Sequence, residues 1–511
     1  MLFNSYIFVL AFLPLALTGF FAAARLGRRA AGCWLIAASL AFYGWWNVSF
    51  VPLLVASMAG NYAAALLLSR LVHRPRRQTW VLVIAIAANL AALVHYKYLS
   101  AMFGFLRAHD VIDITYANPL LPLGISFFTF TQIGFLLDCR NGLARDRSPL
   151  NYALFVTFFP HLIAGPIVHN REIIPQFGDA ATYRWSAHNM SVGSAIFLMG
   201  LLKKCLLADP TSVVVAPGFA HPGALSLFPA WHVALSYSLQ LYFDFSGYSD
   251  MAIGLARMFN VRFPLNFNSP YKAQSVIEYW QRWHMTLTRY LNLYLYDPIA
   301  LGVTRRRHAR GLPTHRAAQA TLPGFAAMVL FPTVVTMTLA GIWHGSGLTF
   351  LVFGLLHATY ISVNHAWRIL HPHTPAPTAR LHIASRVALT YLCVLVGAIM
   401  FRAPTVGAAL DLLAGMLGLH GVDVMLPDAR AVMHTSLDVA WLVMLYAIVW
   451  GAPNTQQIMR DYAPALGRIV PGPWPALRWR PEPRWAVAFG CAATLGLLSI
   501  GGTGEFLYFQ F

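Results

Sequence analysis

The stretch FVPLLVASMAGNYAAALLLSRL, residues 50–71, decides the kind of fold, because its only charge is Arg70 near one end. A segment of this length and composition crosses a hydrocarbon core of ~30 Å as a single helix. Similar apolar windows recur along the chain, at residues 3–24, 33–46, 80–94, 125–137, 152–167, 190–207, 231–258, 325–341, 348–367, 383–400, 437–450 and 485–500. The sequence therefore predicts an all-α polytopic membrane protein.

Composition supports this fold class. Of the 511 residues, 58% are hydrophobic and 11% are charged, and the mean hydropathy is +0.57. An ordinary soluble domain is about a quarter charged. Some windows are too short or too broken by glycine and proline to span alone, so we expect about 11 transmembrane helices plus re-entrant and amphipathic pieces around a central tunnel. No linker and no clear internal repeat divides the chain, which predicts one domain over residues 1–511.

The net charge of +18 is interpreted as a signal for the orientation of the helices in the membrane. No positive charge precedes the first apolar window, and three arginines follow it, which favours an anchor with a periplasmic N-terminus over a cleaved signal peptide. The other basic clusters would face the cytoplasm and anionic lipids. They are Arg70, Arg74, Arg76 and Arg77; Arg140, Arg145 and Arg147; Arg305, Arg306, Arg307, Arg310 and Arg316; and Arg460, Arg468, Arg478 and Arg480. Nucleic-acid binding is not expected. The five cysteines are scattered, without metal-type spacing, so no metal site is expected.

The segment SLQLYFDFSGYSDMAIG, residues 238–254, carries polar groups at membrane depth, where they are costly and often functional. Gln240, Asp244 and Tyr248 follow one another at i, i+4 and share one helical face, whereas Asp250 lies on another face with Ser246. Two interpretations remain open. The face is either a hydrogen-bonded packing seam that Gly247 allows to close, or the lining of a polar tunnel.

A second polar segment, residues 268–298, contains the sequence EYWQRWHMTL. Helical spacing places Trp280, Trp283 and His284 on one face and pairs Glu278 with Arg282. Tryptophans also mark bilayer interfaces, so the segment is interpreted either as a helix lying flat on the membrane or as part of a site that uses His284.

The motif GIWHGSG, residues 341–347, places His344 among three glycines. Glycines at 341, 345 and 347 remove side chains from around the ring, so a ligand or a second chain can approach it. A histidine held in one orientation acts as a general base near neutral pH. The chain lacks the sequence motifs of serine hydrolases, zinc proteases and P-loop enzymes, which leaves histidine as the candidate catalytic group. The alternative is an ordinary buried structural histidine.

Several stretches together resemble the membrane-bound O-acyltransferase (MBOAT) superfamily, and in particular its bacterial alginate O-acetylase branch. They occur in order along nearly the whole chain: PLGISFFTFTQIGFLLD at 122–138, FFPHLIAGPIVH at 158–169, the segment from LQLYFDFSGYSD to RWHMTLTRYL at 239–291, AGIWHGSGLTFLVFGLLHA at 340–358, FRA at 401–403 and FLYFQF at 506–511.

The resemblance implies that His344 is the family's essential histidine and His284 its second histidine near the reaction centre. It also implies a ring of helices around a thin central region where two funnels meet. In related systems an activated acyl group enters from the cytoplasm and is passed outward to a polysaccharide or teichoic acid, usually with a separate extracytoplasmic partner. The residues expected to line the tunnel are Gln240, Asp244, Tyr248, Asp250, Trp283 and Trp343.

The sequence thus predicts an O-acyltransferase of the bacterial inner membrane that O-acetylates an exported polysaccharide such as alginate. No bound cofactor is expected, and the donor is acetyl-CoA or another acyl thioester, whose phosphates Arg305, Arg306 and Arg307 would contact. His344 would deprotonate the acceptor hydroxyl, and His284 or the face that carries Asp244 would orient groups or polarise the carbonyl. The acceptor is either a serine on a partner protein or the sugar hydroxyl.

The expected partners are membrane lipids, a periplasmic acetyltransferase and a polysaccharide-synthesis complex. One rival function is a transporter or flippase for an acyl carrier or a lipid-linked sugar, in which Asp244 and Asp250 would bind the coupling ion. Another is a structural subunit of an export complex. The two Trp-His motifs favour the acyltransferase, because a proton-coupled carrier has no need of both.

Overall fold

The computed structural model describes residues 1–114, 116, 119–144, 146–373, 378–422, 429–467, 469–472, 474–501 and 507, without the side chains of 429–436. Regular structure in these ranges is helical, with one isolated parallel bridge between Pro264 and Leu466. The all-α prediction is confirmed. Arg145, Arg468 and the terminal motif FLYFQF, except for Leu507, lie outside the described residues.

Six described helical segments are long and apolar enough to cross a membrane, judged by length and composition. They are Val48–Arg70, Pro75–Lys97, Ala187–Ala220, Leu322–His344, Leu348–Leu370 and Arg380–Arg402. Five shorter apolar helices accompany them, at Phe8–Ala24, Leu99–Ala108, Val406–Met416, Leu437–Gly451 and Pro483–Leu498. The multi-pass prediction is therefore confirmed, although five of the apolar helices fall short of a full span.

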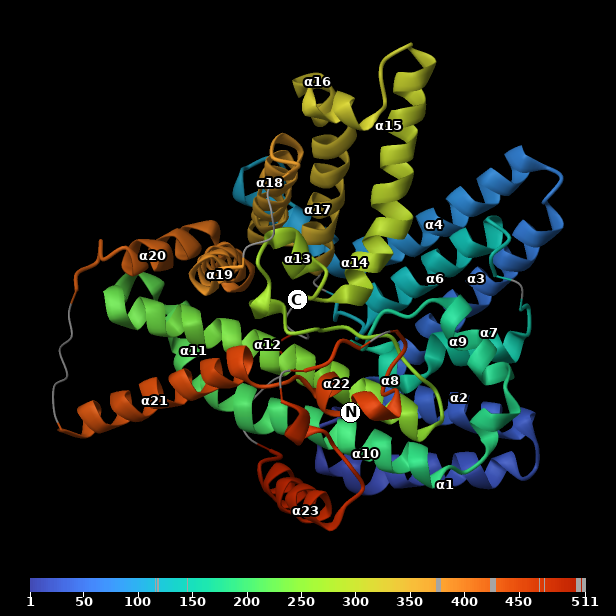
Figure 1. Cartoon of the computed structure of the whole chain (residues 1–511). Coiled ribbons are helices and arrows are strands. Elements are labelled where there is room, and N and C mark those ends of the chain that lie inside the picture. The colour runs from blue at the N-terminus through green and yellow to red at the C-terminus, as the bar shows by residue number, and fades with distance from the viewer. Residues whose placement is uncertain are drawn as a thin grey trace.

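Helix α12 (Leu227–Met258) runs through the middle of the molecule, and α10 (Ala187–Leu202) packs along it (Figure 1). Glycines bring the two backbones together: a Cβ at Gly200 would lie 2.5 Å from the Gly247 carbonyl oxygen, and one at Gly193 would lie 2.6 Å from that of Gly254. Small residues allow this close approach between helices inside a membrane. The packing-seam interpretation is thus confirmed for the Gly247 face of α12.

Helices α17 (Phe331–His344) and α18 (Leu348–Leu370) form a tight hairpin, and its glycines serve packing. A Cβ at Gly341 would lie 2.3 Å from the Phe350 carbonyl oxygen, and one at Gly345 would lie 2.1 Å from the Phe350 ring. The prediction that these two glycines open space for a ligand is therefore wrong, because α18 fills that space. At Gly347 a Cβ would meet nothing closer than Thr349, at 3.4 Å.

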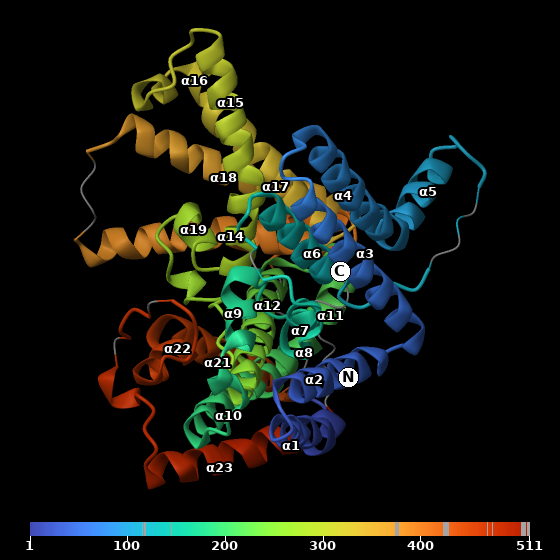
Figure 2. The ribbon, with the colours of Figure 1, turned by 90° about the vertical axis from the view of Figure 1, so that its right-hand side faces the viewer.

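Helix α15 (Asp297–Ala309) and the short α16 (Leu322–Phe325) project beyond the rest of the molecule in both views (Figures 1 and 2). The helix-terminal arginines at positions 305 and 306 are exposed there, and Arg307 is half-buried. The far end of α18 and the start of α19 (Arg380–Arg402) also carry exposed arginines, Arg368 and Arg386. Positive charge thus gathers at the ends of several helices, as a topology signal requires.

Candidate active site

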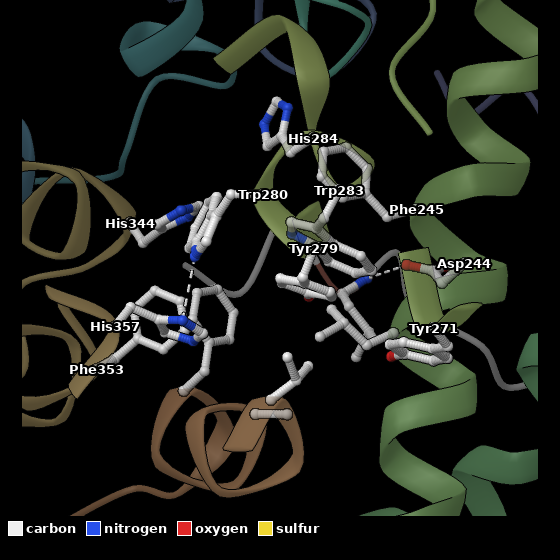
Figure 3. Close-up of a pocket in the computed structure, with 15 residues that line it drawn as sticks. Asp244, Phe245, Tyr271, Tyr279, Trp280, Trp283, His284, His344, Phe353 and His357 are labelled. Carbon is white, nitrogen blue, oxygen red and sulfur yellow. Dashed lines mark hydrogen bonds between the residues drawn. The ribbon is translucent and has the colours of Figure 1, made fainter. Parts of the chain in front are cut away.

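A chamber lies where α12, α13 (Val276–Trp280), α17, α18 and α19 meet (Figure 3). Most of its lining is aromatic or aliphatic. One carboxylate and three imidazoles also line it, those of Asp244, His284, His344 and His357. His344 and His357 lie on one side of the chamber and Asp244 on the other (Figure 3). Polar groups that converge in a mostly apolar pocket are the usual sign of a small-molecule site.

His344 is the last residue of α17 and is 8% exposed. Three aromatic rings surround its imidazole, with centroid distances of 4.9 Å to Trp343, 5.1 Å to Phe401 and 6.0 Å to Phe353. This packing holds the ring in one orientation, which a general base needs.

His344 also lines a second space. A recess lies between the end of α4 (Pro75–Lys97), the approach to α6 (Ile125–Arg140) and the end of α17. Its lining includes Trp46, Lys97 and Trp343. Among the described residues, His344 alone lines both the chamber and the recess. The His344 side chain therefore borders two separate spaces.

His284 lies between α13 and α14 (Met285–Leu291) in the left-handed conformation, with φ 41° and ψ 52°. The prediction of one continuous helix through this histidine is wrong, because α13 ends at Trp280. Residues other than glycine adopt this conformation at an energetic cost, and such residues cluster at functional sites. Hydrogen bonds to Asn266 offset this cost. Its backbone carbonyl oxygen accepts the Met285 N–H at 2.9 Å, and its side-chain oxygen accepts the Thr286 hydroxyl at 2.8 Å.

Asn266 also selects the tautomer of His284. The Asn266 amide nitrogen donates to the Ser249 hydroxyl at 3.0 Å, which assigns the Asn266 side-chain oxygen as the atom 3.0 Å from His284 Nδ1. That oxygen can only accept, so Nδ1 carries the proton and Nε2 presents a lone pair. His284 is 1% exposed, and Nε2 has no hydrogen-bond partner among the described residues. A buried polar atom left in this way points to a ligand or to a chemical role.

Trp280, Trp283 and His284 all line the chamber, although they do not share one helix: Trp280 ends α13, and Trp283 and His284 lie in the turn before α14. The predicted ion pair between Glu278 and Arg282 is present at 2.6 Å.

Sequence reasoning missed His357, a chamber residue on α18 that is 2% exposed. Its Nδ1 lies 3.2 Å from the indole nitrogen of Trp280. An indole N–H only donates, so Nδ1 accepts, and the neutral ring carries its proton on Nε2. The one available signal was an ionisable residue within an apolar helix, which many structural histidines share.

Asp244 lines the chamber as predicted, but its charge is already paired. Its carboxylate lies 2.6 Å from Lys204 Nζ, and its other oxygen accepts the Leu507 backbone N–H at 3.1 Å. Lys204 is 2% exposed and pairs with Asp209 as well. These contacts join α12 to Lys204 and to the backbone of Leu507.

Three predicted tunnel residues do not line the chamber among the described contacts. Tyr248 stacks on Phe3 with a centroid distance of 4.6 Å, and Gln240 is buried within the α12 packing. Trp343 lines the recess instead and stacks on Phe130 at 4.9 Å. The i, i+4 rule placed residues on one helical face, but α12 is surrounded by other helices, so only part of that face borders open space.

Asp250 is also away from the chamber, so the tunnel prediction is wrong for it. Its carboxylate accepts hydrogen bonds from Lys203 at 2.6 Å, Thr455 at 2.6 Å and Gln456 at 2.7 Å. These bonds tie α12 to α22 (Thr455–Ile458), and the carboxylate is fully occupied by protein groups.

A third space, an open groove, shares the walls formed by α13, α18 and α19 with the chamber. Arg316, Arg368 and Arg386 line it, and Arg368 donates to the Ser275 hydroxyl at 3.2 Å. Along α18 the lining changes from His357 in the chamber to Asn364 in the groove, roughly 10 Å further at ~1.5 Å per residue.

The three arginines predicted to contact phosphates, Arg305, Arg306 and Arg307, line none of the three spaces. The Arg307 guanidinium donates to the Pro313 carbonyl at 3.1 Å. In the ranges that the structure describes, no three His, Cys, Asp or Glu side chains are grouped as metal ligands.

Residues 116–314 match the MBOAT, membrane-bound O-acyltransferase family. A peptidoglycan O-acetyltransferase from Helicobacter pylori is 38% identical over 456 residues, covering 83% of this chain and 81% of that protein. The chain belongs to the membrane-bound O-acyltransferase family.

Other relatives indicate which branch of the family the chain belongs to. A probable alginate O-acetylase from Azotobacter vinelandii is 33% identical over 100% of both chains. A teichoic acid D-alanyltransferase from Bacillus subtilis is 26% identical over 249 residues, which cover 48% of this chain and 59% of that protein. The chain is therefore a multi-pass membrane O-acyltransferase of the alginate O-acetylase-like branch, and the transporter and structural-subunit alternatives do not hold.

Proposed function

We propose that this membrane-bound O-acyltransferase moves an acetyl group from a cytoplasmic thioester to an exported polysaccharide such as alginate, with His344 as the general base. The observation that carries the proposal is the position of His344 between the chamber and the recess. A donor that enters from one side and an acceptor that enters from the other would meet at this imidazole.

The donor route would run from the groove to the chamber. Arg316, Arg368 and Arg386 offer three guanidinium groups, which suit phosphate oxygens. A thioester on a flexible arm, as in acetyl-CoA or a carrier-bound acyl group, would then extend along α18 past Asn364 to His357. Basic loops face the cytoplasm in bacterial inner-membrane proteins, which supports a cytoplasmic groove and a periplasmic N-terminus.

The chemistry requires one proton transfer at each stage. His344 would take the proton of the acceptor hydroxyl while the hydroxyl oxygen attacks the thioester carbonyl carbon. The carbon–sulfur bond then breaks, and the departing thiolate takes the proton from His344. The N–H at Nε2 of His357 would donate to the carbonyl oxygen as negative charge develops on it. His284 Nε2, which carries no proton in its assigned tautomer, would orient a hydroxyl or thiol by accepting its hydrogen.

The acceptor side would involve partners. A serine on a periplasmic acetyltransferase or a sugar hydroxyl fits the reaction equally well, and the names of the relatives favour a polysaccharide as the final product. A polysaccharide-synthesis complex in the same membrane would deliver the polymer.

The test replaces His344 by alanine and measures the acetyl content of the exported polymer in cells with equal amounts of inserted protein. His161→Ala is the matched control, because His161 is 4% exposed, lies outside the chamber, and its Nε2 is 2.8 Å from the Phe155 carbonyl. We expect acetylation to be lost only for His344→Ala. Normal acetylation by this variant would overturn the catalytic assignment.

A further inference from the structure

The end of α17 that carries His344 is held by two neighbouring residues at the end of α4. The last carbonyls of a helix have no partner within that helix. Here the Tyr98 hydroxyl donates to the Ile342 carbonyl at 2.7 Å, and Lys97 Nζ donates to the carbonyls of Trp343 at 2.7 Å and His344 at 2.9 Å. Three consecutive carbonyls thus accept hydrogen bonds from residues that lie 244 to 247 positions earlier in the sequence.

The backbone needs this support because α17 stops abruptly. Gly345 is extended, with φ −165° and ψ 166°, and the chain turns at once into α18. A cation is also favourable at this position, since carbonyl dipoles make a helix C-terminus negative. The ammonium of Lys97 therefore fixes the peptide groups on both sides of the His344 side chain.

Lys97 is an unusual choice for a purely structural role. No carboxylate pairs with it among the described residues; its hydrogen-bond acceptors are the two carbonyls, and its Nζ lies 6.0 Å from the centroid of the Tyr98 ring. A cation without a carboxylate partner near the end of an apolar helix is costly and commonly functional. An ammonium has three N–H groups, so one remains after the two carbonyl bonds. Lys97 also lines the recess beside His344.

We infer that Lys97 serves the acceptor side of the reaction. Its two carbonyl bonds position His344 between the chamber and the recess, and its third N–H donates to the acceptor oxygen in the recess. When His344 takes the hydroxyl proton, the negative charge that develops on this oxygen is stabilised by the ammonium, which itself neither gains nor loses a proton. The inference rests on the proposed function and adds a residue that the sequence did not single out.

The test compares Lys97→Met, which removes the donors at similar length, with Lys97→Arg, which keeps charge and donors. Initial rates are measured in membranes that contain the complete acetylation system, with acetyl-CoA and an alginate oligosaccharide varied in turn. For Lys97→Met we expect kcat to fall at least about 10-fold and the acceptor KM to rise, with the donor KM unchanged. Lys97→Arg should recover part of the rate.

Lys272→Met is the matched control. Lys272 also donates to a carbonyl at the end of another helix, that of Ala452 at 2.9 Å, but it lines neither the chamber nor the recess. Both methionine variants remove a lysine–carbonyl bond, so a purely structural role predicts the same outcome for both: less inserted protein and unchanged KM values. That result, or a change confined to the donor KM, would overturn the inference.

Failure of this inference is distinguishable from failure of the proposed function. If Lys97→Met keeps wild-type kinetics while His344→Ala is inactive, only the role of Lys97 is lost. If His344→Ala transfers acetyl groups normally, the proposed function itself fails. Should Lys97→Met not insert, Lys97→Gln, which keeps polarity without charge, supplies the same kinetic comparison.

Discussion

The cluster around Asp250 and the histidines of the chamber both place polar groups at membrane depth, yet they differ in one respect. The Asp250 carboxylate accepts hydrogen bonds from Lys203, Thr455 and Gln456, and Asp250 does not line the chamber, the groove or the recess. His284 instead lines the chamber and has a buried Nε2 without a hydrogen-bond partner among the described residues, and His344 borders two spaces.

This difference distinguishes polar residues that join helices from polar residues that are available to a substrate. Hydrogen bonds within the protein offset the cost of burying a polar group, so a saturated cluster tells only how helices are joined. A buried group whose bonding capacity is open toward a cavity retains that capacity for a substrate. Ionisable residues inside a membrane are thus informative only once their partners are known.

The largest effect is expected at His344. His344→Gln keeps the side chain polar and removes the base, so the transfer rate per folded molecule should fall at least about 100-fold. The measurement is acetyl transfer by purified protein with its partner. A loss smaller than fivefold would place His344 in the same structural class as Asp250.

A smaller loss is expected at the second histidine. His284→Ala removes the Nε2 lone pair that the hydrogen bond to Asn266 leaves unprotonated, and the rate should fall roughly 10- to 100-fold, with less effect on stability. Asn266→Leu should lower the rate as well, because the tautomer is then no longer selected. Rates unchanged in both variants, measured in the same assay, would show that the unpartnered nitrogen has no role.

The groove provides the third prediction. Neutralising Arg316, Arg368 and Arg386 together with glutamine should raise the donor KM about 10-fold and leave kcat nearly unchanged, because these groups lie far from the reacting atoms. The matched control is the same change at Arg305, Arg306 and Arg307, which line none of the three spaces. If the control raises the donor KM and the groove variant does not, the donor docks on α15 instead.

Asp250 supplies the smallest expected change in activity. Asp250→Asn leaves Lys203 without its charged partner, which costs about 3 kcal/mol when a buried pair is broken. The midpoint of thermal unfolding in detergent should fall, while the rate per folded molecule stays within about twofold. A rate loss that exceeds the loss of folded protein would move Asp250 into the reaction.

Much of the fold was accessible from the sequence, because apolar windows and basic loops are local signals. The grouping of Trp280, Trp283 and His284 was also local, since neighbouring residues on one segment meet the same space. The break at His284 was not, because it depends on Asn266, which lies 18 positions earlier.

The wrong predictions for Asp250 and for the glycines beside His344 have one cause: the residues that contact them are distant in the sequence or are placed by tertiary packing. Nothing near Asp250 in the sequence indicates Thr455 or Gln456, which are more than 200 positions away. The space that glycines leave beside His344 is filled by Phe350, a contact that only the packed hairpin reveals. The position of Lys97 beside the active site is likewise evident only from its hydrogen bonds to the carbonyls of Trp343 and His344.

In the proposed function, His344 joins two routes from opposite sides of the membrane. The most direct test uses inside-out vesicles from cells with the complete system, with the polymer acceptor enclosed and labelled acetyl-CoA added outside. We expect labelled polymer in the lumen with the wild-type protein and none with His344→Gln at equal insertion. Label in the lumen with His344→Gln, or wild-type transfer only when donor and acceptor share one side, would contradict it.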